Sequence, residues 1–306
     1  MHNYYRRKMI KTHSIKKLKI TLLFIIFGII VVVSGITVAE KVFKSRQDIT
    51  ASEIESSVVE NNLINPEIGV YLPFGEDPVA DDAAFVEKYL YQQSKGMMPE
   101  GADGKKVAYL TFDDGPSETV TPMILDILKE KDVKATFFVL GQAVNKNDNT
   151  KEIIKRMAAE GNAIGNHTYT HDYKILYPNK TVNCDNFIND VERTNTALKA
   201  ILGDKFYTRV IRFPGGHMSW NGMEPLDEIL VSKDYHQVDW NALSKDAEGK
   251  TKNADELFEI VKSTVQNREK AVILMHDKEG KEETAKALPQ IIDYLKEQGF
   301  EFRTIK

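Results

Sequence analysis

The chain has 306 residues, of which 42% are hydrophobic and 28% are charged. This composition excludes a wholly disordered chain, and the length suffices for one sizeable core with a smaller appendage. The formal charge is −4, but residues 1–19 carry seven basic and no acidic side chains, which leaves −11 for the remainder. Such an acidic remainder argues against a nucleic-acid partner.

Residues 20–39 form an uncharged apolar run. Its length is about that needed to cross a hydrocarbon layer of about 30 Å as a helix. The basic residues before it predict that residues 1–19 are cytoplasmic and that everything after Ala39 is extracellular. A signal peptidase could cleave after Ala39, but the run is longer than the apolar core of a signal peptide. We therefore expect an uncleaved, single-pass anchor in the cell membrane, in preference to a signal peptide or a buried core helix.

Cys184 is the only cysteine of the chain, so no internal disulfide and no thiolate-rich zinc site can form. We expect this residue to be a packed free thiol. Any metal site must therefore consist of histidine and carboxylate side chains.

Residues 40–103 are polar and irregular, with helices expected over 51–60 and 79–93, and we interpret them as a spacer or small accessory region. From residue 107 onward, short apolar runs alternate with amphipathic helices, which predicts a parallel sheet in one α/β domain of residues 104–306. About seven strands in this length favour a distorted (β/α) barrel over an open sheet. Strands are expected over 107–112, 135–140, 163–165, 209–213, 235–238, 271–275 and 300–305, and helices over 122–131, 151–160, 185–202, 225–232, 254–267 and 282–298.

Two motifs predict a metal site. In HTYTH, His167 and His171 are four residues apart and would share one face of a helical turn. In TFDDGPS, Asp113 and Asp114 end the first strand, and two adjacent carboxylates are best accommodated when a cation binds one of them. Each motif alone also has a structural explanation, such as a turn or a helix cap. Together they predict that Asp114, His167 and His171 bind one divalent ion and that Asp113 stays free as a base.

Two histidines and one aspartate leave coordination positions open for water, which is typical of a catalytic site. Zinc is the expected ion, and cobalt, nickel or iron would also fit these ligands. Water bound to such an ion can have a pKa of about 7, and Asp113 could accept its proton during attack on a carbonyl. His276 ends another strand and has the titration range of a general acid, unless it is only structural. Asp239 could orient its imidazole and raise its pKa.

The segment RFPGG follows the fourth expected strand. Arg212 could pair with Asp113 and keep it ionised, the alternative being a surface ion pair. Pro214 and Gly215 bring little side-chain bulk, so the Gly215 N–H is a candidate donor to an oxyanion.

Apolar side chains near these motifs could contact a sugar ring or an acetyl methyl group. Trp240 and Leu274 are the expected wall, and Trp220 and Tyr169 could contribute if they are not part of the core. The candidate metal ligands and catalytic residues follow successive strands, and α/β barrels build their active sites at the C-terminal ends of strands. The sequence therefore predicts one shared pocket.

The five motifs TFDDGPS, HTYTH, RFPGG, Asp239-Trp240 and LMHD occur in this order, and residues 104–306 thereby resemble the polysaccharide deacetylase family, carbohydrate esterase family four. The resemblance implies a metal-dependent hydrolase of amide bonds that removes acetyl from N-acetylglucosamine. It assigns Asp113 as base, Arg212 as the residue that orients it, and His276 as the acid assisted by Asp239. It also implies the metal ligands Asp114, His167 and His171.

Gly215 departs from the family pattern, because many members carry a bulky residue there. The backbone role survives, whereas a substrate contact from that side chain is lost. His217 has no role that the sequence assigns.

An anchor and spacer would hold the domain at the outer face of the cell membrane, so peptidoglycan of the cell wall is the expected substrate. No protein partner is inferred. The alternatives are deacetylation of poly-N-acetylglucosamine or chitin oligomers, O-acetyl esterase activity of the xylan type, and a non-catalytic wall-binding domain.

Overall fold

The computed structural model describes residues 71–306 of the chain. The basic segment 1–19, the anchor 20–39 with its cleavage site, and the helix expected over 51–60 lie outside the described residues. Within residues 71–306, no helix has both the length and the apolar character to span a bilayer.

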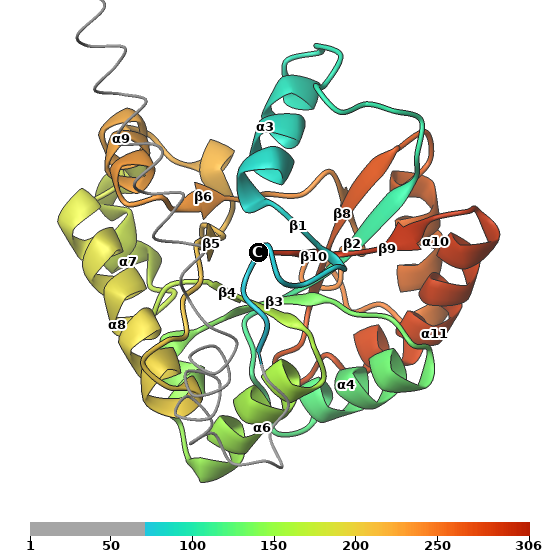
Figure 1. The fold of residues 1–306 in the computed structure, drawn as a ribbon, viewed down its shortest axis with the longest axis horizontal. Coiled ribbons are helices and arrows are strands. Elements are labelled where there is room, and N and C mark those ends of the chain that lie inside the picture. Colours follow the sequence, from blue (N-terminus) through green and yellow to red (C-terminus); the bar gives the residue numbers. More distant parts are fainter. Residues whose placement is uncertain (1–70) are drawn as a thin grey trace, which may run out of the picture. The chain divides into compact units, whose positions relative to one another are not determined.

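A curved sheet of parallel strands forms the centre of the domain (Figure 1). Seven strands follow the order β6-β5-β4-β3-β2-β8-β7, and β9 pairs with the beginning of β2. The path does not close between β6 and β7, so the predicted distorted barrel is a half-barrel. The strands are β2 (Val107–Asp113), β3 (Thr136–Val139), β4 (Ala163–Asn166), β5 (Val210–Ile211), β6 (His236–Gln237), β7 (Ala242–Leu243), β8 (Lys270–His276) and β9 (Glu301–Phe302).

Helices surround the outside of this sheet (Figure 1). Six helices were expected at nearly these positions, whereas the one-turn helices α5 and α7 were not. The helices are α4 (Val120–Glu130), α5 (Gly141–Val144), α6 (Asp148–Ala159), α7 (Tyr173–Leu176), α8 (Cys184–Leu202), α9 (Glu224–Ser232), α10 (Ala254–Thr264) and α11 (Glu282–Glu297), with 3₁₀ turns at Pro178–Lys180 and His217–Ser219. Cys184 is a partly buried free thiol packed against the core, as expected.

The two faces of β2 explain how the strand positions catalytic side chains. Ala108, Leu110 and Phe112 pack into the outer core against the helices, whereas Val107 and Tyr109 belong to the core inside the half-barrel. Side chains alternate along a strand, so Thr111 and Asp113 also face the interior. This alternation brings Asp113 to the inner rim at the C-terminal end of the strand.

Residues 71–103, the described part of the expected spacer, belong to this domain. β1 (Ala80–Asp81) pairs with β10 (Thr304–Ile305) in parallel register. α3 (Ala83–Ser94) buries Val86 and Tyr89. Its Glu87 carboxylate accepts hydrogen bonds from His236 Nδ1 at 2.8 Å and from the N–H of Gln237 at 3.2 Å. α3 thus lies beside β6, at one edge of the open side of the half-barrel (Figure 1).

Two expected elements had wrong boundaries and one strand was missed, for identifiable reasons. The helix expected over 79–93 begins only at Ala83, because Asp82 caps it and the two residues before that cap pair with β10. The strand expected over 300–305 divides into β9 and β10, which have different partners. β7 was not expected, because two residues are too short to show an alternating pattern.

Candidate metal centre and active site

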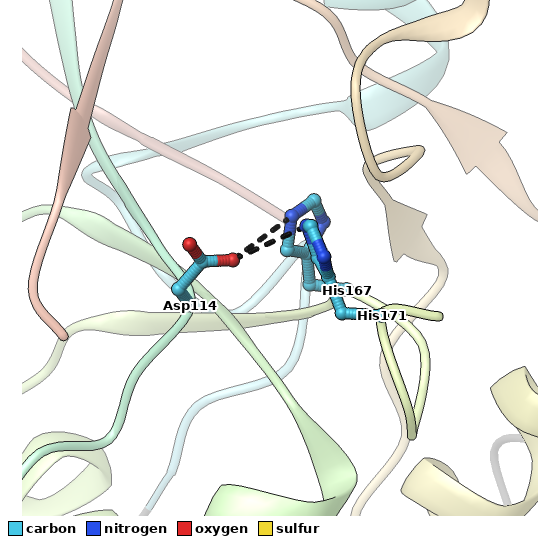
Figure 2. A group of neighbouring side chains, drawn as sticks. All are labelled: Asp114, His167 and His171. Atoms are coloured by element: carbon cyan, nitrogen blue, oxygen red, sulfur yellow. Dashed lines mark ion pairs between the residues drawn. The ribbon is translucent and has the colours of Figure 1, made fainter. Parts of the chain in front are cut away.

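Asp114, His167 and His171 come together as the sequence predicted (Figure 2). One ligand atom from each lies within 4.8 Å of the others. Asp114 Oδ1 is 3.6 Å from Nε2 of His167 and 3.4 Å from Nε2 of His171. The three side chains therefore direct one oxygen and two nitrogens at a common point.

The histidines reach this point from a non-helical segment, so the expected helical turn was wrong. His167 directly follows β4, and both Thr168 and His171 have positive φ values, 69° and 53°. Two left-handed residues reverse the chain within the motif and bring the second imidazole beside the first. The i, i+4 spacing found the right residues although the backbone that joins them is not a helix.

Hydrogen bonding and burial leave both imidazoles able to coordinate a cation. His167 Nδ1 lies 2.8 Å from the carbonyl oxygen of Arg212, which can only accept, so Nδ1 carries the proton and Nε2 the lone pair. Burial, together with the neighbouring His167, lowers the pKa of His171 to about 4. His171 is therefore neutral near pH 7.

Asp114 has the features of a ligand whose partner is a cation. Burial would raise its pKa, but the neighbouring imidazoles of His167 and His171 and a hydrogen bond from Lys278 lower it overall. Oδ2 accepts from Lys278 Nζ at 2.7 Å, whereas Oδ1 is buried without a hydrogen-bond partner. A buried carboxylate oxygen that lacks a donor and faces two imidazole lone pairs fits a divalent ion.

Asp113 lies beside this centre and is held by Arg212, as the sequence predicted. Arg212 Nη1 donates to Asp113 Oδ1 at 2.8 Å and to Thr111 Oγ1 at 2.7 Å. Asp113 Oδ2 is 3.8 Å from His167 Nε2. Arg212 is fully buried, and its Nε donates to the Val238 carbonyl at 2.8 Å, so the pair is an internal structure and not a surface ion pair.

His276 lies beside Asp113, because the two are register partners on the neighbouring strands β8 and β2. Its Nδ1 contacts Asp246 Oδ1 at 2.7 Å, and its backbone N–H donates to Asp246 Oδ2 at 2.8 Å. Burial alone would lower the pKa of His276, but the hydrogen bond and negative charge of Asp246 raise it above the ordinary value. Nε2 is the ring nitrogen left for proton transfer.

Asp246, and not Asp239, is therefore the carboxylate that supports His276. The sequence reasoning missed Asp246 because it follows β7, which was not predicted. Had this strand been recognised, the rule that active-site residues follow strands would have included Asp246.

Asp239 instead holds the loop that carries the candidate oxyanion donor. Both of its carboxylate oxygens accept from the N–H of His217 at 3.2 Å, and its carbonyl accepts from Arg212 Nη2 at 3.1 Å. The His217 ring contacts Asp227 of α9 at 2.9 Å, which gives this histidine a structural role. Gly215 lies in the same loop with φ +80°, a conformation that suits glycine.

The expected apolar wall is only partly at the metal centre. Leu274 is buried in β8, two residues before His276. Trp240 borders a cavity of about 830 Å³ between α3 and α9, which includes none of the three metal-site residues. Tyr169 packs beneath Arg193, whose guanidinium carbon lies 3.8 Å from the centre of the Tyr169 ring. Trp220 contacts the loop that carries Gly215, because its Nε1 donates to the Pro214 carbonyl at 2.9 Å.

The loop after β8 contacts the loop after β2 and the first turn of α4 through three consecutive side chains. Asp277 accepts from Thr121 Oγ1 at 2.6 Å, Lys278 donates to Asp114, and Glu279 accepts from the N–H of Glu118 at 2.9 Å. These contacts join the loop that follows His276 to the loop that carries Asp113 and Asp114.

Comparison with known proteins agrees with this geometry. Residues 100–224 match the polysaccharide deacetylase family. The chain is 36% identical over 229 residues to a peptidoglycan-N-acetylglucosamine deacetylase of Bacillus cereus, covering 72% of this chain and 73% of the relative. It is 33% identical over 201 residues to a bifunctional xylanase/deacetylase of Pseudobutyrivibrio xylanivorans, covering 66% of this chain and 30% of that protein.

A solved structure shows the same fold. The Streptococcus mutans CE4 esterase superposes with a TM-score of 0.69 at 35% identity, over 79% of this chain and 100% of that one. The chain thus belongs to the polysaccharide deacetylase family, carbohydrate esterase family four, a family of hydrolases.

Proposed function

We propose that the chain removes acetyl groups from N-acetylglucosamine residues of peptidoglycan and releases acetate. The observation that carries this proposal is the placement of two separately supported proton-transfer groups, Asp113 and His276, beside three converging metal ligands. The similarity to the peptidoglycan deacetylase of Bacillus cereus supports peptidoglycan as the glycan.

The residues divide the reaction among them. Asp114, His167 and His171 would hold one divalent ion, with zinc as the expected metal. Such an ion polarises a carbonyl and makes water a better nucleophile. Asp113, oriented by Arg212, accepts the proton of the attacking water.

The tetrahedral intermediate needs a donor for its oxyanion and a proton for its leaving amine. The Gly215 N–H would supply the first. His276, oriented by Asp246, donates a proton to the departing amine nitrogen, which otherwise is a poor leaving group.

An O-acetyl esterase is the second candidate, because the chain also resembles a bifunctional xylanase/deacetylase. The same groups can hydrolyse an acetyl ester, whose alkoxide leaving group also needs a proton. Acetate release should therefore be measured side by side on muropeptides, chitin oligomers and acetylated xylan. Release from chitin oligomers or xylan without release from muropeptides would contradict the peptidoglycan proposal.

Removal of the metal provides the first prediction. Chelation should abolish acetate release, and returning zinc or cobalt should restore it, because the ion would polarise the acetyl carbonyl and make water a better nucleophile. Asp113→Asn should lower kcat by about 100-fold or more even with the metal restored, since a positioned base contributes at least this factor. Activity indifferent to both changes would contradict this mechanism, and no acetate release by the metal-loaded wild type from any of these substrates would favour a non-catalytic wall-binding domain.

The proposal includes a location at the outer face of the cell membrane, anchored through residues 20–39. The apolar run and the basic residues before it support this arrangement. Fractionation of cells and protease treatment of intact cells would test it, and a chain recovered in the soluble cytoplasmic fraction would contradict it.

A further inference from the structure

The metal centre opens toward solvent on the side of His171. The side chains of His167 and Asp114 are 4% and 6% exposed, whereas that of His171 is 25% exposed. Of the three ligands, His171 is therefore the one that solvent or a substrate reaches most directly.

Tyr173 forms the wall at this opening. Its ring centre is 5.2 Å from that of His171, and the residue is 44% exposed. It is the second residue after the HTYTH motif and begins α7, whose N-cap is Asp172. A half-exposed aromatic ring thus lies directly against a metal ligand.

A rigid aromatic group supports the Tyr173 ring from behind. Trp220 meets it edge-on with ring centres 5.0 Å apart, and Trp220 itself stacks on buried Tyr177 at 4.0 Å with an angle of 5°. The indole N–H donates to the Pro214 carbonyl. This packing fixes the orientation of the exposed ring, so little side-chain entropy would be lost on binding.

These two aromatic side chains also occupy the space that a side chain at Gly215 would need. A Cβ atom built there would lie 3.1 Å from Trp220 and 3.3 Å from the Tyr173 hydroxyl. The hydroxyl therefore lies next to the candidate oxyanion donor. Trp240, which the sequence suggested as the sugar platform, borders the cavity between α3 and α9 instead.

We propose that Tyr173, backed by Trp220, is the surface on which the pyranose ring of the reacting sugar packs. Tyr173 thereby determines that the carrier of the acetyl group is a sugar. The inference rests on the proposed function. The apolar C–H face of a pyranose matches the face of a tyrosine ring, and the Tyr173 hydroxyl can form a hydrogen bond with a sugar hydroxyl.

The substitutions Tyr173→Ala and Tyr173→Phe in the full-length, metal-loaded protein test this surface, with the N-acetylglucosamine tetramer as substrate. Loss of the ring should raise KM about tenfold and leave kcat within about twofold, because the contact forms equally with substrate and transition state. Tyr173→Phe keeps the ring and should stay within about threefold of the wild-type KM. The matched control is Tyr207→Ala, since Tyr207 is 48% exposed and precedes β5, at the end of that strand away from Arg212.

A binding measurement separates this inference from the proposed function. The chain has two tryptophans, and quenching of Trp220 fluorescence by the glucosamine tetramer, the deacetylated product, should report binding without any turnover. Tyr173→Ala should weaken the dissociation constant about tenfold, and Trp220→Phe should remove the signal.

An unchanged KM and dissociation constant in Tyr173→Ala would overturn the inference, as would a loss confined to kcat, which would instead indicate an effect on His171. Failure of the wild-type protein to bind either tetramer would also overturn it. Binding that depends on Tyr173 without any acetate release would support the inference and contradict only the proposed function.

Discussion

At the residue scale, Asp113 and His276 receive their support from different partners. Arg212 donates to Asp113, and Asp246 accepts from His276. Neither supporting residue shares a strand with the group it supports. Substitution of a supporting residue should therefore change one proton-transfer step and spare the other.

Asp246→Asn should move the basic limb of the pH–rate profile to lower pH. Asp246 raises the pKa of His276, and His276 must be protonated to act as an acid, so loss of the negative charge makes the imidazole lose its proton at lower pH. The kcat/KM profile of the metal-loaded protein provides the measurement. Asp239→Asn is the control and should leave this limb in place; the reverse result would restore Asp239 to the role that the sequence suggested.

Gly215→Ala should destabilise the protein more than Gly104→Ala does. Both glycines have similar φ values, +80° and +77°, but only a Cβ at Gly215 meets neighbouring atoms, at 3.1 Å from Trp220. The left-handed backbone costs an alanine about 1 kcal/mol at both positions, and the contact adds to this cost only at Gly215. Urea unfolding would measure the difference, and equal losses would show that Trp220 moves aside freely.

At the scale of elements, the catalytic rim depends on contacts between loops that follow neighbouring strands. β2 and β8 pair along their full length, and the loops after them are joined through Asp277, Lys278 and Glu279. The strands set the spacing of Asp113 and His276, and these loop contacts hold Asp114 in place. Asp277 is fully buried, and its Oδ1 has no hydrogen-bond partner.

Burial raises the pKa of Asp277 to about 7, and the negative charges of Asp114 and Asp113 add to this effect. Between the ordinary aspartate pKa of 3.8 and about 7, the folded protein keeps a proton that the unfolded chain has released. The contribution of this group to the unfolding free energy is therefore present at low pH and falls as pH rises through that window.

As pH rises from 4 to 7, the unfolding free energy of Asp277→Asn should accordingly fall less than that of the wild type, because the asparagine amide stays neutral. Urea unfolding of the metal-free protein at several pH values would test this, with exposed Asp204→Asn as the control. Parallel profiles for wild type and Asp277→Asn would contradict a buried neutral acid at this position.

At the scale of the described domain, residues 71–103 cover part of the half-barrel. β1 pairs with the C-terminal strand, α3 buries Val86 and Tyr89, and the Lys306 ammonium is paired with Asp77 at 2.6 Å with both side chains at most 5% exposed. A domain that started at residue 104 would expose the surfaces these groups cover.

Truncation to residues 104–306 should therefore lower Tm relative to residues 71–306. Burial of each large apolar side chain contributes about 1.5–3 kcal/mol, so the loss of Val86 and Tyr89 alone predicts a decrease of at least about 5 °C. Thermal unfolding followed by circular dichroism would measure it. Equal Tm values would restore the boundary at residue 104 that the sequence suggested.

Much of the fold and of the metal centre could be predicted from the sequence because both depend on local patterns. Apolar alternation reports which faces are buried, and strand ends in a parallel sheet meet at one rim, so Asp113, Asp114, His167 and His276 could be placed together. The pairing of Arg212 with Asp113 followed from charge and proximity at that rim.

The sequence by itself therefore determined the family, the parallel sheet and the three candidate ligands. Only the tertiary structure decided that Asp246 supports His276, that α3 belongs to the domain, and that Tyr173 lines the opening. These choices depend on loops with positive φ values, on two-residue strands and on packing between distant segments. None of these leaves a periodic pattern in the sequence, because each becomes favourable only after the partner surface has formed.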